Sequence, residues 1–193
     1  MKKSTSFLPF IAVLFSLMVI TSCFSGKEQD NMNESIQTIF FDTSFGATKE
    51  EVISNFKKHG FALVSFVSND NILRFSPING MYFSFGNMSW EDMRVSLNNN
   101  KFCAIEFYNA YKEKFSAESD YNSILSALKA KYKMAEEELS DTLTYKIQRG
   151  IDGKGHVVIV YYQKAESFNN EIWFYSCLLY SDTNIEDEPS DEL

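Results

Sequence analysis

The chain has 193 residues, a mass of 22.2 kDa and a formal net charge of −8, with 45% hydrophobic and 16% aromatic residues. This length suits one domain, and the apolar content is sufficient for a core. The acidic balance argues against nucleic-acid binding, which needs clustered Lys and Arg, and against adhesion to anionic lipid headgroups. Phe and Tyr dominate the aromatic residues, which favours strands over helices.

The N-terminus carries the pattern of an export signal. Lys2 and Lys3 precede the apolar run Phe7–Ile20, which is too short to span a bilayer comfortably. Small residues then lead to Cys23 in the order Ile-Thr-Ser-Cys, so the segment resembles a bacterial lipoprotein precursor. The resemblance implies cleavage before Cys23, diacylation of its thiol, acylation of the new amino group, and a stable lipid anchor in the cell envelope, at the outer membrane. An ordinary secretory signal with an incidental cysteine is the alternative.

Three segments outside the predicted domain have no globular pattern. Residues 1–22 are the predicted signal peptide, residues 23–35 a flexible polar tether, and residues 182–193 an acidic, disordered tail. Residues 36–181 remain for a single α+β domain. Cleavage removes two lysines and so moves the formal charge from −8 to −10.

The central residues predict two helices, each followed by strands. Thr48 and Glu51 form a capping box at the start of a helix that ends at Gly60, and the apolar spacing over Glu118–Tyr132 predicts the second helix. Turn residues such as Asn79-Gly80 separate the strands of an antiparallel meander. The predicted strands are Gln37–Asp42, Phe61–Val67, Ile72–Phe75, Met81–Phe85, Asp92–Leu97, Phe102–Tyr108, Lys133–Glu138, Thr142–Gln148, His156–Lys164 and Glu171–Tyr180.

A shift of 72 residues lays the first half of the domain on the second. It places Val52 on Ile124, and Lys101–Tyr108 on Trp173–Tyr180. We therefore expect two helix-plus-meander repeats, 45–110 and 115–181, with both helices on one face of a long antiparallel sheet of about eight or nine strands. Chance agreement between two ordinary α+β halves is the alternative.

The start of the first predicted helix carries a family resemblance. Gly46–Val52 (GATKEEV), opening a helix before a meander, resembles the Gly-x-Thr-x-x-Glu-Val helix starts of β-lactamase-inhibitor-protein-like domains, which include tandem forms and the small lipoproteins of the outer-membrane barrel-assembly machinery. The resemblance implies a long sheet whose open face or edge binds another protein. The second half starts with Ser116-Ala117-Glu118 and lacks the motif. The Ile-Thr-Ser-Cys motif at Cys23 and the short predicted strands of the first repeat also resemble those of lipoproteins from Bacteroidota-type anaerobes.

The sequence shows no catalytic or metal-binding pattern. His59 is expected to cap the first helix, and His156 is expected at the surface where a strand begins. The chain has no Gly-x-Ser-x-Gly motif, EF-hand spacing or His/Cys ligand cluster, so we expect no catalysis, cofactor or metal. Cys103 and Cys177 lie in strand-like runs, which favour buried thiols, although export would permit a disulfide between them.

Aromatic residues in the strands are the remaining functional signal. Alternate residues face opposite sides of a sheet, so one set packs under the helices while the other faces solvent, a partner or a second layer. We expect Trp90, Trp173, Tyr175 and Tyr161 to line a binding face, since Tyr and Trp are enriched at binding hot spots. The predicted function is non-catalytic binding of another envelope protein through a sheet face or edge. The alternative is an accessory lipoprotein that binds a glycan or peptide.

Overall fold

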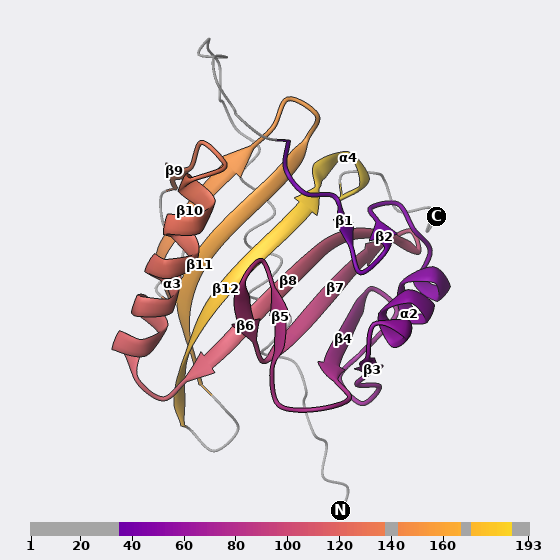
Figure 1. Ribbon diagram of the computed structural model, residues 1–193, viewed down its shortest axis with the longest axis horizontal. Coiled ribbons are helices and arrows are strands. Elements are labelled where there is room, and N and C mark those ends of the chain that lie inside the picture. Colours follow the sequence, from indigo (N-terminus) through magenta and orange to yellow (C-terminus); the bar gives the residue numbers. More distant parts are fainter. Residues whose placement is uncertain (1–34, 138–142, 167–170, 187–193) are drawn as a thin grey trace, which may run out of the picture.

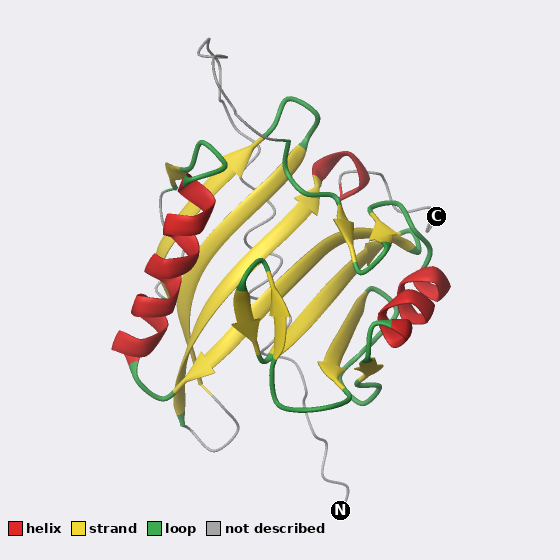
Figure 2. Ribbon diagram, in the orientation of Figure 1, coloured by secondary structure: helices red, strands yellow, loops and turns green. Residues whose placement is uncertain are grey.

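A computed structural model describes residues 35–137, 143–166 and 171–186. Its main feature is an eight-stranded antiparallel sheet in the order β3-β4-β7-β8-β12-β11-β10-β9 (Figure 1), with helices over one face (Figure 2). The predicted α+β class, two helices over a long antiparallel sheet, is confirmed. The strands of the sheet are β3 (Phe61–Leu63), β4 (Ile72–Pro77), β7 (Asp92–Asn98), β8 (Lys101–Tyr111), β9 (Ala135–Glu136), β10 (Thr144–Ile151), β11 (His156–Glu166) and β12 (Ile172–Asp182).

Helix α2 (Lys49–Lys58) begins where the capping box predicts. Thr48 Oγ1 accepts a hydrogen bond from the backbone N–H of Glu51 at 3.3 Å, and Glu51 Oε2 accepts one from the backbone N–H of Thr48 at 2.8 Å. These two bonds satisfy amide groups that a helix start otherwise leaves unpaired. Val52 and Phe56 lie four residues apart on one helix face and are fully buried against the sheet.

Helix α3 (Lys114–Lys129) begins four residues before the predicted start and ends three residues before the predicted end. Its N-cap is Glu113, which makes no side-chain capping bond, so the sequence carries no start signal there. Tyr132 lies beyond the helix but stays buried in the same core, which explains why periodicity extended the prediction to it. The helix residues that face the sheet are Ala117, Tyr121, Ile124 and Leu128.

The two halves of the chain share one element order. The order helix, then four strands of the main sheet, holds for α2 with β3, β4, β7 and β8 and for α3 with β9 to β12, and the two meanders meet at β8 and β12. β8 and β12 each have 11 residues and start 71 positions apart. Their antiparallel register pairs Phe107 with Leu178, which are also 71 positions apart. The topology therefore has an approximate twofold axis through this central pair.

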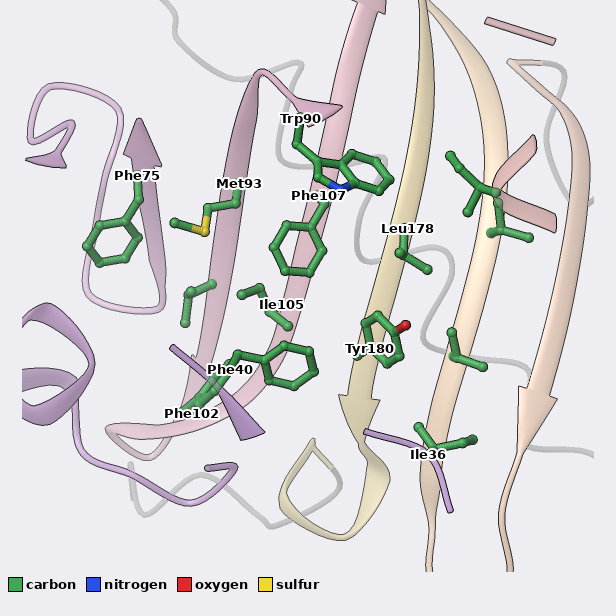
Figure 3. Close-up of a cluster of buried hydrophobic side chains, with 14 of the residues drawn as sticks. Ile36, Phe40, Phe75, Trp90, Met93, Phe102, Ile105, Phe107, Leu178 and Tyr180 are labelled. Atoms are coloured by element: carbon green, nitrogen blue, oxygen red, sulfur yellow. The ribbon is translucent and has the colours of Figure 1, made fainter. Parts of the chain in front are cut away.

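The main core lies between the sheet and the elements on its helix-covered face. Phe107 is at the centre, close to Trp90 (Figure 3). Its ring stacks on that of Phe85 at 4.2 Å between centroids and lies 5.6 Å from the ring of Trp90. Two hairpins complete this layer, one formed by β1 (Ile39–Phe40) and β2 (Thr43–Ser44), the other by β5 (Phe83–Phe85) and β6 (Met88–Trp90). The predicted strand Met81–Phe85 thus belongs to a hairpin over the core rather than to the main sheet.

The prediction of a disordered tail from residue 182 is wrong for residues 182–186. Asp182 ends β12, and the short helix α4 (Thr183–Glu186) follows. Asn98 Nδ2 donates to Ile185 O at 2.8 Å, and Asn184 Nδ2 donates to Lys154 O at 2.8 Å. The first described residues lie at the end of the sheet where α4 lies (Figure 1). We call this end the termini end and the opposite end the distal end. Residues 187–193 lie outside the described residues.

Candidate binding face

The face of the sheet opposite α2 and α3, which we call the second face, is the candidate site. Both of these helices and both hairpins pack on the helix-covered face (Figure 1). On β8, Ile105 and Phe107 point into that core, and the alternation of side chains places Glu106 and Tyr108 on the second face. The same alternation on β12 places Cys177 there, next to the core residue Leu178.

A charged strip crosses the second face on β4, β7 and β8. Arg74 and Arg94 lie directly opposite each other in the strand register, where two like charges repel. Each arginine is matched by a carboxylate: Arg74 Nε donates to Asp92 Oδ2 at 2.7 Å, and Arg94 Nε donates to Glu106 Oε2 at 2.8 Å. Burial by itself lowers the pKa of Arg94, but the Glu106 carboxylate together with Tyr161, Tyr108 and Cys177 outweighs burial, and the pKa is raised. Arg94 therefore stays charged, and the strip carries two compensated ion pairs.

Three tyrosines lie beside this charged strip: Tyr108 on β8, Tyr161 on β11 and Tyr175 on β12. Tyr108 contacts both the arginines and Tyr175. Its ring centroid lies 5.8 Å from the guanidinium carbon of Arg74 and 5.4 Å from that of Arg94, and it meets the ring of Tyr175 edge-on at 6.2 Å. The Tyr161 hydroxyl donates a hydrogen bond to Glu106. Burial raises the pKa of Tyr108 and of Tyr161, so both hydroxyls are protonated at neutral pH.

Three of the four predicted binding residues share the second face. Trp173 and Tyr175 alternate on β12 and are partly exposed, whereas Tyr161 is only 5% exposed and belongs to the buried cluster against which Tyr175 packs. The prediction for Trp90 is wrong, because this side chain is fully buried in the main core and its Nε1 donates to Phe85 O at 3.0 Å. The β5–β6 hairpin folds over the helix-covered face and takes Trp90 with it.

The sequence analysis did not identify the two arginines, although the strands contain a signal for them. Arg74 stands between Leu73 and Phe75, and Arg94 between Met93 and Val95. All four apolar neighbours are in the main core, so the alternation of a strand places both guanidiniums on the opposite face. A charged residue flanked on both sides by apolar core residues of a strand is thus a usable marker of the second face.

Cys103 and Cys177 are buried thiols that are not joined in a disulfide. Cys177 is paired in register with Tyr108, five residues along β8 from Cys103. At about 3.4 Å per residue this offset is roughly 17 Å, far beyond the 7 Å or less between the Cα atoms of a disulfide. The thiols therefore act as small packing groups, and burial raises the pKa of the Cys177 thiol.

The described histidines each contact an aspartate. His59 is the C-cap residue of α2, as predicted, and its Nε2 lies 2.7 Å from Asp42 Oδ2. His156 is more enclosed than predicted, with a side chain 18% exposed and its Nδ1 2.9 Å from Asp152 Oδ2. Within residues 35–137, 143–166 and 171–186, no group of three or more His, Cys, Asp or Glu side chains is placed to hold a metal ion.

The anchor prediction falls on residues that the structure does not describe. Cys23, the predicted signal peptide and the predicted tether up to residue 34 lie outside the described residues. No helix in the described part of the chain is long and apolar enough to cross a membrane. Comparison of the chain with protein-family models, with curated proteins and with solved structures finds no match.

Proposed function

We propose that this chain is a lipid-anchored envelope protein, non-catalytic, that binds another envelope protein through the second face of its sheet. One observation carries the proposal: α2, α3 and both hairpins pack on one face, while the other face combines arginine, tyrosine and tryptophan side chains. These three residue types are the ones enriched among the side chains that dominate binding energies.

The arrangement of the second face suits binding because its contact groups are already held in place. The Arg74 side chain is 38% exposed, but its guanidinium is fixed by Asp92 and lies near the Tyr108 ring. Tyr175 is partly exposed and packs against a buried cluster, and Lys112 Nζ lies 3.8 Å from the ring centroid of the partly exposed Trp173. Side chains fixed in the free protein lose less conformational entropy on binding, so more of the contact energy contributes to affinity.

The second face is a better candidate than the edges of the sheet for the contact with a partner protein. The edge strands β3 and β9 have only three and two residues. Short edge strands limit the pairing of an added strand, which is one way in which sheet proteins avoid edge-to-edge association. We therefore expect a partner to lie across the second face rather than to extend the sheet.

Affinity capture from gently solubilised envelopes tests the proposal. The chain would carry a C-terminal tag, with Cys23→Ser as the unanchored control and Tyr175→Ser as the second-face variant. Phe66→Ser is the matched control, since Phe66 is an exposed aromatic residue on the connection between β3 and β4. The proposal expects a stoichiometric companion that is retained by Phe66→Ser and lost with Tyr175→Ser. Equal recovery with both variants would contradict the second-face contact.

Capture of the protein alone would favour the alternative function, a glycan- or peptide-binding lipoprotein. Thermal unfolding in the presence of panels of glycans and peptides would then test whether one of them binds the native protein. A ligand that binds only the native state raises the melting temperature, and Tyr175→Ser should remove that rise if the ligand occupies the second face.

A further inference from the structure

All arginines of the chain lie in one row on the second face. Only three of its eighteen Lys and Arg residues are arginines. Residues that pair directly across neighbouring antiparallel strands share one face of the sheet, and the strand register connects all three arginines in this way. From β4 to β10 the row contains Arg74, Arg94, Glu106, Leu179, Ile159 and Arg149. We call these six residues the arginine row.

The arginine row crosses the middle of the sheet. Glu106 is the sixth of the 11 residues of β8, so the row lies midway between the termini end and the distal end. In the sheet order, β7 and β10 are four strand spacings apart. At about 4.8 Å each, these spacings separate the backbones of Arg94 and Arg149 by roughly 19 Å. Leu179 and Ile159, both partly exposed, occupy the interval.

In each ion pair of the row, the guanidinium is the more exposed partner. The side chain of Arg74 is 38% exposed, whereas that of its partner Asp92 is 8% exposed. The pair of Arg94 shows the same order, 22% against 5%, and so, by a small margin, does the pair of Arg149, 30% against 25%. An approaching partner therefore meets positive charge first, although each pair is neutral as a whole.

The guanidiniums can bind a further anion while they keep their own carboxylates. An arginine guanidinium carries several N–H donors in a planar fork. Asp92 contacts Nε and Nη2 of Arg74, and Glu106 contacts the same two atoms of Arg94. In the described part of the chain these contacts occupy one edge of each fork. The other edge has the geometry to donate to the oxygens of a second carboxylate.

Folding stability alone does not account for this placement. Arg74 and Arg94 stand directly opposite each other, and like charges in that position destabilise a sheet. A buried ion pair such as that of Arg94 with Glu106 often stabilises a protein less than apolar side chains of the same size would. Contact with a partner supplies the benefit that the isolated domain lacks.

We propose that the partner lays an acidic segment across the second face, with carboxylates at the arginines and apolar side chains on Leu179 and Ile159. The proposal rests on the proposed function and specifies the chemistry of its partner. Complementary charge favours this segment, because a basic one would meet exposed guanidiniums and be repelled. The row has two arginines at one end and one at the other, so it also fixes the direction in which the segment lies.

Photo-crosslinking from the centre of the arginine row, in cells that make the full chain, tests the proposal. A photoreactive residue replaces Ile159, alone or together with Arg149→Gln or Lys146→Gln. Lys146 is the matched control, because it lies on the same strand as Arg149 but pairs with Glu118 of α3, at 3.0 Å, on the helix-covered side. Each substitution removes one positive charge from a partly exposed ion pair.

We expect one discrete product with another protein. Its yield should fall roughly tenfold with Arg149→Gln and stay unchanged with Lys146→Gln, because an arginine that contacts a partner is commonly among the few side chains that dominate affinity. Both variants should keep the melting temperature of the parent, since exposed ion pairs contribute little stability. Mass spectrometry should place the crosslink in a segment with more Asp and Glu than Lys and Arg. Arg149→Glu should regain yield when an acidic residue of that segment is replaced by Arg.

Equal yields with the two variants, or a crosslinked segment without an excess of Asp and Glu, would overturn the acidic segment and leave the second-face contact standing. No protein product from Ile159, or a product at twice the mass of the chain, would refute the proposed function as well.

Discussion

Replacing Glu106 by Gln tests whether charge holds the charged strip of the second face together. Glu106 is 4% exposed and accepts hydrogen bonds from Arg94 and Tyr161. Gln has the same size and keeps an acceptor for Tyr161, so the substitution removes mainly the negative charge. Arg94, whose side chain is 22% exposed, would then be left without its carboxylate.

We expect the single substitution to lower the free energy of unfolding by about 3 kcal/mol, the low end of the range for breaking a buried pair, because Arg94 retains some solvent. Arg94→Met alone should cost about as much, since it leaves the buried Glu106 carboxylate without its arginine. The double variant has no unpaired charge and should lose only about 1 kcal/mol. The coupling energy from this cycle is therefore large.

Urea unfolding followed by tryptophan fluorescence measures the effect. With a slope near 2 kcal/mol per molar urea, each single variant should shift the midpoint down by about 1.5 M, and the double variant by about 0.5 M. Additive losses in the double variant would refute the reasoning, because they would mean that Arg94 and Glu106 contribute through packing rather than through their charges.

Three further outcomes follow from local contacts. Thr48→Ala removes the capping box and should lower the free energy of unfolding by about 1 kcal/mol, visible as a lower melting temperature. Burial opposes ionisation of Asp152, but hydrogen bonds from His156 and two backbone amides outweigh it, so its pKa is lowered. Its stabilisation is complete above the unfolded pKa of about 3.9 and is lost as pH falls through the folded value, so Asp152→Asn should lose less stability than the parent on acidification in melting curves. Cys103 and Cys177 should resist a thiol reagent in the native state and titrate as two thiols after unfolding without reductant; a yield of none would contradict the free thiols.

Most of the fold could be predicted from the sequence because periodicity reports burial. The period of two in the strands, and the spacing of Tyr121, Ile124 and Leu128 in α3, both record which side chains meet the core. The start of α3 could not be predicted, because its first three residues, including the exposed Phe115, contribute nothing to that pattern. A helix start can be predicted from a capping box only where the sequence contains such a box, as it does at Thr48.

The candidate site was less predictable, because it depends on which face of the sheet each strand presents. Alternation correctly grouped Trp173 with Tyr175 and placed Phe174 opposite, since these are neighbours on one strand. It could not place Trp90, because the sequence does not say that the chain leaves the sheet after β4 and folds back over the core. The pairing of Arg94 with Glu106 likewise depends on the register between two strands, which no local pattern records.

The junction of β8 and β12 has a consequence for how the chain folds. Within each half, the connections between neighbouring strands are far shorter, as where Asn98 pairs with Lys101, whereas Phe107 and Leu178 meet across 71 positions of sequence. Closing that long loop costs chain entropy that the local hairpins do not, so the hairpins form first and the junction last. Until β12 arrives, β8 is an edge strand of 11 residues, far longer than either edge of the finished sheet. Strand exchange between chains and aggregation are therefore expected at this stage of folding, when synthesis has delivered the first half without the second.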